Sequence, residues 1–373
     1  MTGRLPAAAL HVGAMLGPFG GGVVAAILTE LGTGFGVSPA AASSSLTAYL
    51  LPFALLMLVS GTIGERWGAN RCIRLAYLLF LAASLLSAAA PWFWLFQLGR
   101  GLQGAANAFT TPLLLAGLAT ITPKARLGRA LGLFGAMQAL GQTSAPLLGG
   151  LAAEVNWRWA FVGPAVVAAV LAACPLPPDR SPASAEPARL RAAWRWAVLR
   201  PGLIALAGWA CLAGLSFLVA FRLEDAFAAS SGPRGLVLTG YGVAGFLTAR
   251  LVGGLADRFG AATSTLLGLA GGALVLAAIG LVDSFPLIAV AWALAGICAQ
   301  LIIVGVNATV LADGPHGRGG AISVVQALRF LGMAAAPAAF TGIYHQSAAL
   351  GFLLPAGLLL LAILLLRPSR APA

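Results

Sequence analysis

Residues 61–68 read GTIGERWG, and residues 253–260, which lie 192 positions further along, read GGLADRFG. Both stretches place an acidic residue, an arginine, an aromatic residue and a glycine in the same order. Tyr49 and Tyr241, which precede the two stretches, share the same offset. The sequence therefore predicts two halves that repeat one fold.

The sequence around these two stretches is that of a membrane protein. Hydrophobic residues make up 60% of the 373 residues and charged residues only 9%, whereas a soluble domain carries about 25% charged residues. Twelve apolar segments are each long enough to cross the roughly 30 Å hydrocarbon layer as a helix, and lipid offers no partner for free backbone groups. We expect an all-α membrane protein with twelve transmembrane helices in two pseudo-symmetric six-helix bundles. The expected spans are 8–29, 44–64, 73–92, 93–117, 128–151, 159–177, 202–221, 236–255, 264–282, 285–309, 319–342 and 347–366.

The basic residues predict the orientation of these spans. The net charge is +12, and most of the 22 basic residues fall on one side, whereas Arg158, Arg222 and Arg234 fall on the other. By the positive-inside rule the first side is cytoplasmic, with both termini, so we expect a multi-pass protein of the inner cell membrane. A polar linker at 177–201, partly an amphipathic helix on the membrane surface, separates an N-terminal bundle, 1–176, from a C-terminal bundle, 202–373.

Three motifs resemble those of the major facilitator superfamily. The first is the loop motif after the second span, which occurs in both halves. The first copy has Glu65 in place of the usual Asp, which the second copy keeps as Asp257. The second is Arg-x-x-Gln-Gly in the fourth span, and the third is similar to the fifth-span signature of the drug–proton antiporters, with Ala145 as a mild departure. The residues are, in turn, Gly61, Glu65, Arg66 and Gly68 with Gly253, Asp257, Arg258 and Gly260; Arg100, Gln103 and Gly104; and Gly141, Pro146, Gly149 and Gly150.

The resemblance implies a secondary transporter of the efflux branch in which the two halves rock about a central solute site. The loop motif would act as a gating latch on the cytoplasmic side, and the fifth-span signature would bend or pack that helix. Small residues in these motifs let neighbouring helices approach closely. Transporters built from two such halves place their solute near the middle of the membrane.

Polar side chains within the spans are the candidates for the solute pathway. They recur at helical spacing, so each set lies on one face of its helix. An intramembrane arginine is costly and by default indicates a pathway or a paired site, and Arg329 falls near the middle of its span. The candidates are Arg100, Gln103, Asn107, Gln138, Gln142, Gln300, Asn307, Gln326 and Arg329.

No span carries a carboxylate at its centre. A proton relay needs a group that can change its charge, which leaves His11, Glu30, Glu224 and Asp225 as the candidates for proton coupling. Arg100 and Arg329 place two positive charges within the spans, without a carboxylate at the centre, and these charges repel a cationic solute. We therefore expect an anionic or zwitterionic metabolite or a neutral amphiphile.

Export of drugs or metabolites is the leading interpretation, and an uptake permease for an anionic or zwitterionic metabolite is the alternative. A transport-inactive sensor or scaffold on the same fold is a third hypothesis, although both loop motifs are largely intact. An intramembrane enzyme would need a partnered nucleophile or base, and His11 has no close acidic or Cys partner in the sequence. The expected partners are the lipid bilayer, a small solute and protons, without a cofactor, metal or nucleic acid, and a monomer suffices.

Overall fold

The first half of the chain folds into consecutive helices joined by short turns. The computed structural model describes residues 4–177, 195–312 and 318–366, and within these ranges all regular structure is helical. The helices of the first half are α1 (Arg4–Gly22), α2 (Leu28–Phe35), α3 (Pro39–Trp67), α4 (Ala69–Ala89), α5 (Phe93–Ile121), α6 (Lys124–Val155) and α7 (Trp159–Ala173).

The second half repeats this order. Its elements are α9 (Trp196–Cys211), the 3-10 turn η1 (Ala213–Leu215), α10 (Ser216–Phe227), α11 (Ser231–Phe259), α12 (Ala261–Leu281), α13 (Phe285–Ala312), α14 (Arg318–Gln346) and α15 (Ala348–Ile363). Each of the twelve expected spans falls on one of these helices or broken helices, and seven helical segments are long and apolar enough, by length and composition, to cross a membrane. Residues 178–194, most of the expected linker, lie outside the described ranges.

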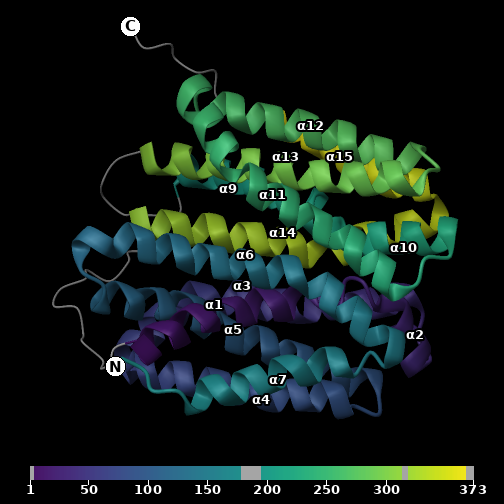
Figure 1. The fold of residues 1–373 in the computed structure, drawn as a ribbon. Coiled ribbons are helices and arrows are strands. Elements are labelled where there is room, and N and C mark those ends of the chain that lie inside the picture. The colour runs from purple at the N-terminus through teal and green to yellow at the C-terminus, as the bar shows by residue number, and fades with distance from the viewer. Residues whose placement is uncertain (1–3, 178–194, 313–317, 367–373) are drawn as a thin grey trace, which may run out of the picture. The chain divides into compact units, whose positions relative to one another are not determined.

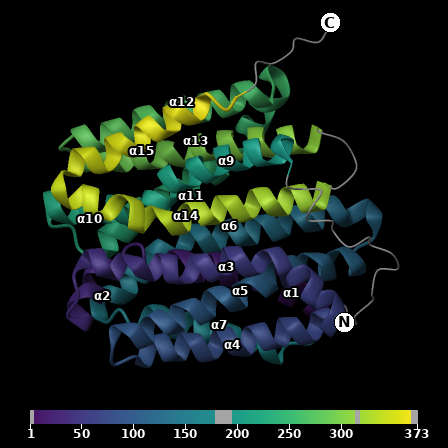
Figure 2. The same cartoon turned by 180° about the vertical axis from the view of Figure 1, so that it is seen from behind.

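The helices form two compact units. The first contains α1 to α7 together with residues 230–236, so that it includes the start of α11, and the second contains α9, α10 and the helices from residue 237 onward. Within the first unit α4 and α7 lie side by side, and within the second their counterparts α12 and α15 do the same (Figures 1 and 2). The two units therefore share one order of helix packing.

Close approaches of backbones repeat in the same way. A Cβ added to Gly104 in α5 would overlap the carbonyl oxygen of Tyr49 in α3, and a Cβ added to Gly296 in α13 would overlap the carbonyl oxygen of Tyr241 in α11. Both pairs have the 192-residue offset of the repeated loop motif. Glycine in these places lets two helices touch at the backbone, so the repeat seen in the sequence is a repeat of helix contacts.

The two copies of the loop motif make the same sharp turn. Gly68 separates α3 from α4 with φ of 87°, and Gly260 separates α11 from α12 with φ of 88°. Glycine enters this region freely because it has no Cβ. The final glycine of each motif is thus required by the backbone.

Two of the expected spans are broken, which the sequence analysis did not anticipate. The span at 8–29 ends as α1 at Gly22 and resumes as α2 at Leu28, and the span at 202–221 is interrupted by η1. In the first break, tight turns satisfy the backbone through bonds from Ala25 N–H to Gly22 O and from Ile27 N–H to Val24 O. Residues 23–28 are buried, so this irregular backbone is shielded by protein, as it must be at membrane depth.

Candidate functional site

The candidate pathway residues fall into a buried group and an accessible group. Arg100, Gln103 and Asn107, all on α5, are almost completely buried within the first unit. The remaining candidates keep part of their surface accessible, and Gln142 is exposed. These residues are Gln138 and Gln142 on α6, Gln300 and Asn307 on α13, and Gln326 and Arg329 on α14.

Arg100 is held by a hydrogen bond and two aromatic rings inside the first unit, although its Nε and Nη2 have no hydrogen-bond partner among the described residues. Its Nη1 donates to Gln103 Oε1 at 2.7 Å, and Gln103 Nε2 donates to Ser84 Oγ on α4 at 2.8 Å. The guanidinium carbon lies 4.5 Å from the ring centroid of Tyr49 and 5.8 Å from that of Phe161. A guanidinium at these distances is stabilised by the negative faces of the rings. The network ties together α3, α4, α5 and α7.

Arg329 occupies a different environment in the second unit. Its guanidinium carbon lies 4.7 Å from the ring centroid of Trp209 on α9 and 4.5 Å from that of Phe330. No carboxylate pairs with it among the described residues. Its Nε is buried without a hydrogen-bond partner in that part of the chain, and so are Gln326 Oε1 and the Tyr241 hydroxyl. Three polar atoms in one region of the second unit are thus left unsatisfied.

Sequence reasoning did not select Trp209, Tyr241 or Trp292 as site residues. Tyr241 was used only to identify the repeat. Trp209 and Trp292 are apolar, and from the sequence alone such residues are interpreted as packing residues of the core. The structure stacks Tyr241 on Trp292 with ring centroids 5.0 Å apart. The usable signal was the repeat offset, because Trp292 occupies the position that corresponds to Arg100, and each of the two rests against the tyrosine of its own half.

The loop motif lies at the ends of α3 and α11. Arg66, Asp257 and Arg258 are exposed, and Arg258 lies over the ring of Phe259, 5.1 Å from its centroid. Asp257 forms no ion pair within the described ranges, and the Glu65 side chain lies outside the described residues. The role of the motif as a gating latch therefore stays a prediction.

The fifth-span signature is a set of backbone contacts in the first unit. A Cβ on each of its glycines would overlap a carbonyl oxygen of a neighbouring segment, and a Cβ on Gly235 of α11 would overlap the carbonyl oxygen of Pro146. The carbonyl oxygens are those of Met15 for Gly141, of Val23 for Gly149 and of Ser231 for Gly150. Gly141 and its repeat partner Gly332 make corresponding contacts, since Gly332 faces the carbonyl oxygen of Leu206. Packing thus explains why these positions are glycine.

The acids expected at the outer ends of the spans have partners. Glu30 on α2 forms an ion pair with Arg234 in the first turn of α11, and Arg234 also donates to Thr29 Oγ1 at 3.2 Å. Arg234 itself is almost completely buried. The bond holds the start of α11 against α2 within the first unit.

A second acid, Glu154 at the end of α6, caps the start of α11. Its Oε1 accepts from the backbone N–H of Gly232 at 2.7 Å and from the Ser231 hydroxyl at 3.3 Å. The Gly232 N–H holds the pKa of Glu154 below its usual range, and the hydroxyl of Ser230 acts in the same direction. A carboxylate at a helix N-terminus is favoured by the helix dipole.

The remaining proton-coupling candidates also contact neighbours. Asp225 Oδ2 accepts from the Tyr344 hydroxyl at 2.7 Å in the second unit. His11 Nε2 lies 3.4 Å from the carbonyl oxygen of Ala130 on α6, and Glu224, on α10, is also engaged with a neighbour. None of these contacts by itself assigns a role in proton transfer.

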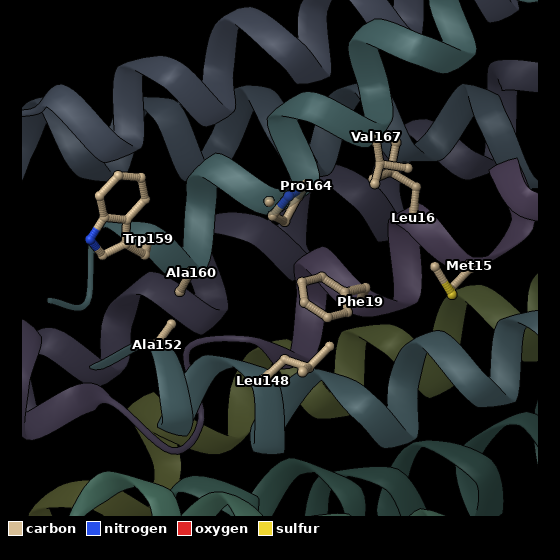
Figure 3. A pocket seen from close by; sticks show the side chains of 10 residues that line it. Met15, Leu16, Phe19, Leu148, Ala152, Trp159, Ala160, Pro164 and Val167 are labelled. Carbon is tan, nitrogen blue, oxygen red and sulfur yellow. The ribbon is translucent and has the colours of Figure 1, made fainter. Parts of the chain in front are cut away.

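The first unit also contains an apolar pocket between α1, α6 and α7. Figure 3 shows the Phe19 ring and Leu148 facing one another across it, with Trp159 at one end, and its volume is about 250 Å³. Its lining carries no charged side chain. The pocket includes none of the pathway candidates, and its chemistry suits apolar contacts alone.

Comparisons with known proteins place these features in context. The model of the Major Facilitator Superfamily matches residues 10–224 and 215–373. A Multidrug resistance protein B homolog of Mycobacterium tuberculosis is 36% identical over 154 residues, which are 40% of this chain and 28% of that protein. The Puromycin resistance protein pur8 of Streptomyces alboniger is 35% identical over 164 residues, which are 43% of this chain and 33% of that protein. The matches therefore span about a third or less of the length of these relatives.

A solved structure agrees with the fold. The xylose transporter XylE from E. coli, in a partially occluded inward open conformation, aligns with a TM-score of 0.75 at 14% identity, covering 97% of each chain. At this identity the likeness concerns the fold alone.

Proposed function

Because the chain belongs to the major facilitator superfamily, we propose that this multi-pass membrane transporter exports small organic compounds by alternating access. The family match covers both halves, and it indicates a transporter rather than an enzyme. The observation that carries the proposal of export is the identity, above a third over about 40% of the chain, to proteins named for multidrug and puromycin resistance. Those names describe the relatives, and for this chain they support efflux.

The helix contacts are compatible with this mechanism. The glycine positions of the fifth-span signature bring backbones together without interlocking side chains, which suits helices that must shift against one another. The two units have the same internal packing order, as expected for halves that move as bodies. We propose that the termini lie in the cytoplasm, since most of the basic residues fall on that side.

We further propose that export is coupled to protons through Glu30. Its carboxylate is paired with Arg234, so that protonation would remove one charge of the pair and release the start of α11. In the second unit, Asp225 accepts a hydrogen bond from Tyr344, and Asp283 forms an ion pair with Arg222. Glu30 differs from them because its partner is almost completely buried, and a buried charge that loses its partner is strongly disfavoured.

The proposal is tested with the full chain in proteoliposomes of known orientation. A panel of organic anions, zwitterions, neutral amphiphiles and cations is loaded inside or outside, with and without an imposed pH gradient, and protein-free liposomes serve as the control. Export predicts solute movement from the cytoplasmic to the outer face that a gradient acid on the outer side accelerates. Net movement in the opposite direction under that gradient would favour the uptake permease, and no movement of any solute would favour the sensor or scaffold.

A further inference from the structure

We propose that Arg329 and Tyr241 of the second unit form the recognition site for the anionic group of the solute, and that Arg100 of the first unit is a packing residue. This inference deepens the proposed function by assigning the solute class and the residues that select it. Arg100 and Arg329 are equivalent pathway candidates in the sequence, but Arg100 is completely buried whereas Arg329 is partly accessible.

The two arginines differ in their hydrogen bonds and in their accessibility. Arg100 Nη1 donates to Gln103, which in turn donates to Ser84. Its Nε and Nη2 have no hydrogen-bond partner among the described residues, but the side chain is completely buried, so a solute does not reach them. Arg329 Nε is buried without a hydrogen-bond partner in the described part of the chain, whereas part of the surface of this side chain is accessible. A guanidinium offers five N–H donors in a planar fork, so the accessible side of Arg329 can present donors to a solute, whereas the enclosed Arg100 cannot.

The two tyrosines related by the repeat differ in the hydrogen bonding of their hydroxyls. Tyr49 and Tyr241 occupy equivalent positions, and each lies against the partner expected from the repeat, Arg100 or Trp292. The Tyr49 hydroxyl donates to the carbonyl oxygen of Gly17 at 2.7 Å. The Tyr241 hydroxyl is buried and has no partner among the described residues. The first half thus uses this hydroxyl for structure, whereas the hydroxyl of the second half has no partner among the described residues, and we assign it to the solute.

Aromatic rings and polar groups surround Arg329. The faces of Trp209 and Phe330 stabilise its charge without using its N–H groups, and its charge acts on Tyr241. Gln326 precedes Arg329 by three residues and therefore lies on the same face of α14. A buried polar atom without a partner costs free energy, and a solute that supplies the partners recovers it. Arg329 and the Tyr241 hydroxyl both donate, so the complementary group is an acceptor with negative charge, such as a carboxylate or a sulfonate.

Binding to the full chain in lipid nanodiscs tests this assignment. The probes are 4-phenylbutyrate and 4-phenylbutanesulfonate, with 4-phenylbutanamide and 4-phenylbutylamine as neutral and cationic compounds of the same skeleton, and equilibrium dialysis measures the bound fraction. We expect both anions to bind at least about ten-fold more tightly than the amide or the amine, because charge-assisted bonds to a guanidinium are the strong ones. Equal or weaker binding of both anions would overturn the proposal.

Matched substitutions then locate the site. Arg329→Gln is expected to weaken anion binding by about ten-fold or more while leaving amide binding unchanged, and Tyr241→Phe, which keeps the ring stacked on Trp292, to weaken it several-fold. Tyr49→Phe is the repeat-related control, and it should leave anion affinity unchanged. Thermal unfolding of each variant checks the fold, and Arg329→Lys, which retains the charge, should restore part of the affinity lost in Arg329→Gln. Anion affinity that survives Arg329→Gln, or falls equally in Tyr49→Phe, would refute the assignment.

The outcome for the site is separable from that for the proposed function. If the anions bind as expected but no solute crosses proteoliposome membranes, the site stands and the transport proposal fails. If organic anions are exported by the wild-type chain and by Arg329→Gln at the same rate, transport stands and this site does not select the solute.

Discussion

Among single residues, the glycines at backbone contacts carry the most specific constraint on the sequence. Gly104 and Gly296 have no space for a Cβ, because each faces the carbonyl oxygen of a tyrosine on a neighbouring helix. We expect Gly104→Ala and Gly296→Ala each to destabilise the protein by about 1–3 kcal/mol, the usual cost of overpacking. Thermal unfolding in detergent, followed by tryptophan fluorescence, measures the effect.

Gly254 on α11 is the control for this experiment, since a Cβ there would meet open space. Gly254→Ala should leave the melting temperature unchanged or raise it, because alanine favours the helix by about 1 kcal/mol. If all three substitutions lowered stability equally, the two repeated backbone contacts would not be the cause of the loss.

The carboxylate of Glu154 gives a prediction with a defined pH dependence. The Gly232 N–H lowers the pKa of this group in the folded protein, so the stabilisation is fully present above the ordinary carboxyl pKa and is lost as pH falls through the folded value. Glu154→Gln should therefore lower the melting temperature at neutral pH, and the difference from the wild type should shrink as the solution is acidified. A difference that grew at low pH would contradict the assigned sign.

At the scale of helices and turns, three left-handed glycines differ in what they tolerate. Gly36 has φ of 66° and ψ of 32°, which asparagine also adopts, whereas Gly68 and Gly260 combine φ near 90° with ψ of 125° and 158°. The second combination is close to a region that only glycine populates. Gly68→Asn and Gly260→Asn should each cost about 1–3 kcal/mol, and Gly36→Asn much less. The melting temperatures of the three variants, compared in one detergent, measure these costs. Equal losses of stability would contradict the prediction, because they would mean that the turns at Gly68 and Gly260 relax to accept asparagine.

The sequence predicted the helices better than their interruptions. Apolar runs and the repeated loop motif placed each span, because length and charge pattern are local properties. The breaks after Gly22 and Cys211 depend on neighbouring helices that shield the irregular backbone, and no local pattern reports that shielding. Turn-forming residues were present, since Pro18 and three consecutive glycines end α1, but the same residues also occur inside unbroken membrane helices.

The candidate site was predicted by residue type but not by partner. Arg100 and Arg329 were both identified from their cost in lipid, which is a property of one side chain. Their difference arises from Gln103, Ser84 and the tyrosine of each half, and it depends on tertiary contacts. The repeat offset provided the one long-range signal in a single sequence, because it relates Tyr49 to Tyr241 without any knowledge of the fold.

For the whole molecule, α11 is the element that both compact units share. Its first residues belong to the first unit and the remainder to the second, and Glu30 and Glu154 hold its start. In the proposed alternating access, a shift of the second half would act on these contacts through α11. The ion pair between Glu30 and Arg234 could be released in this way. Protonation of Glu30 would remove the attraction, whereas the glycine packing of α6 would remain.

This arrangement allows a test of the proposed proton coupling through Glu30. Glu30→Gln keeps the shape of the side chain but removes its charge, so we expect solute exchange without a gradient to persist while acceleration by an imposed pH gradient is lost. Asp283→Asn is the matched control, since Asp283 in the second unit is also paired with an arginine but is exposed, and it should retain the response to the gradient. Exchanging the two partners, Glu30→Arg with Arg234→Glu, should restore hydrogen-exchange protection at residues 231–236 that Glu30→Gln reduces. Gradient-driven transport by Glu30→Gln at the wild-type rate would exclude Glu30 as the coupling group, and the search would then move to His11, Glu224 and Asp225.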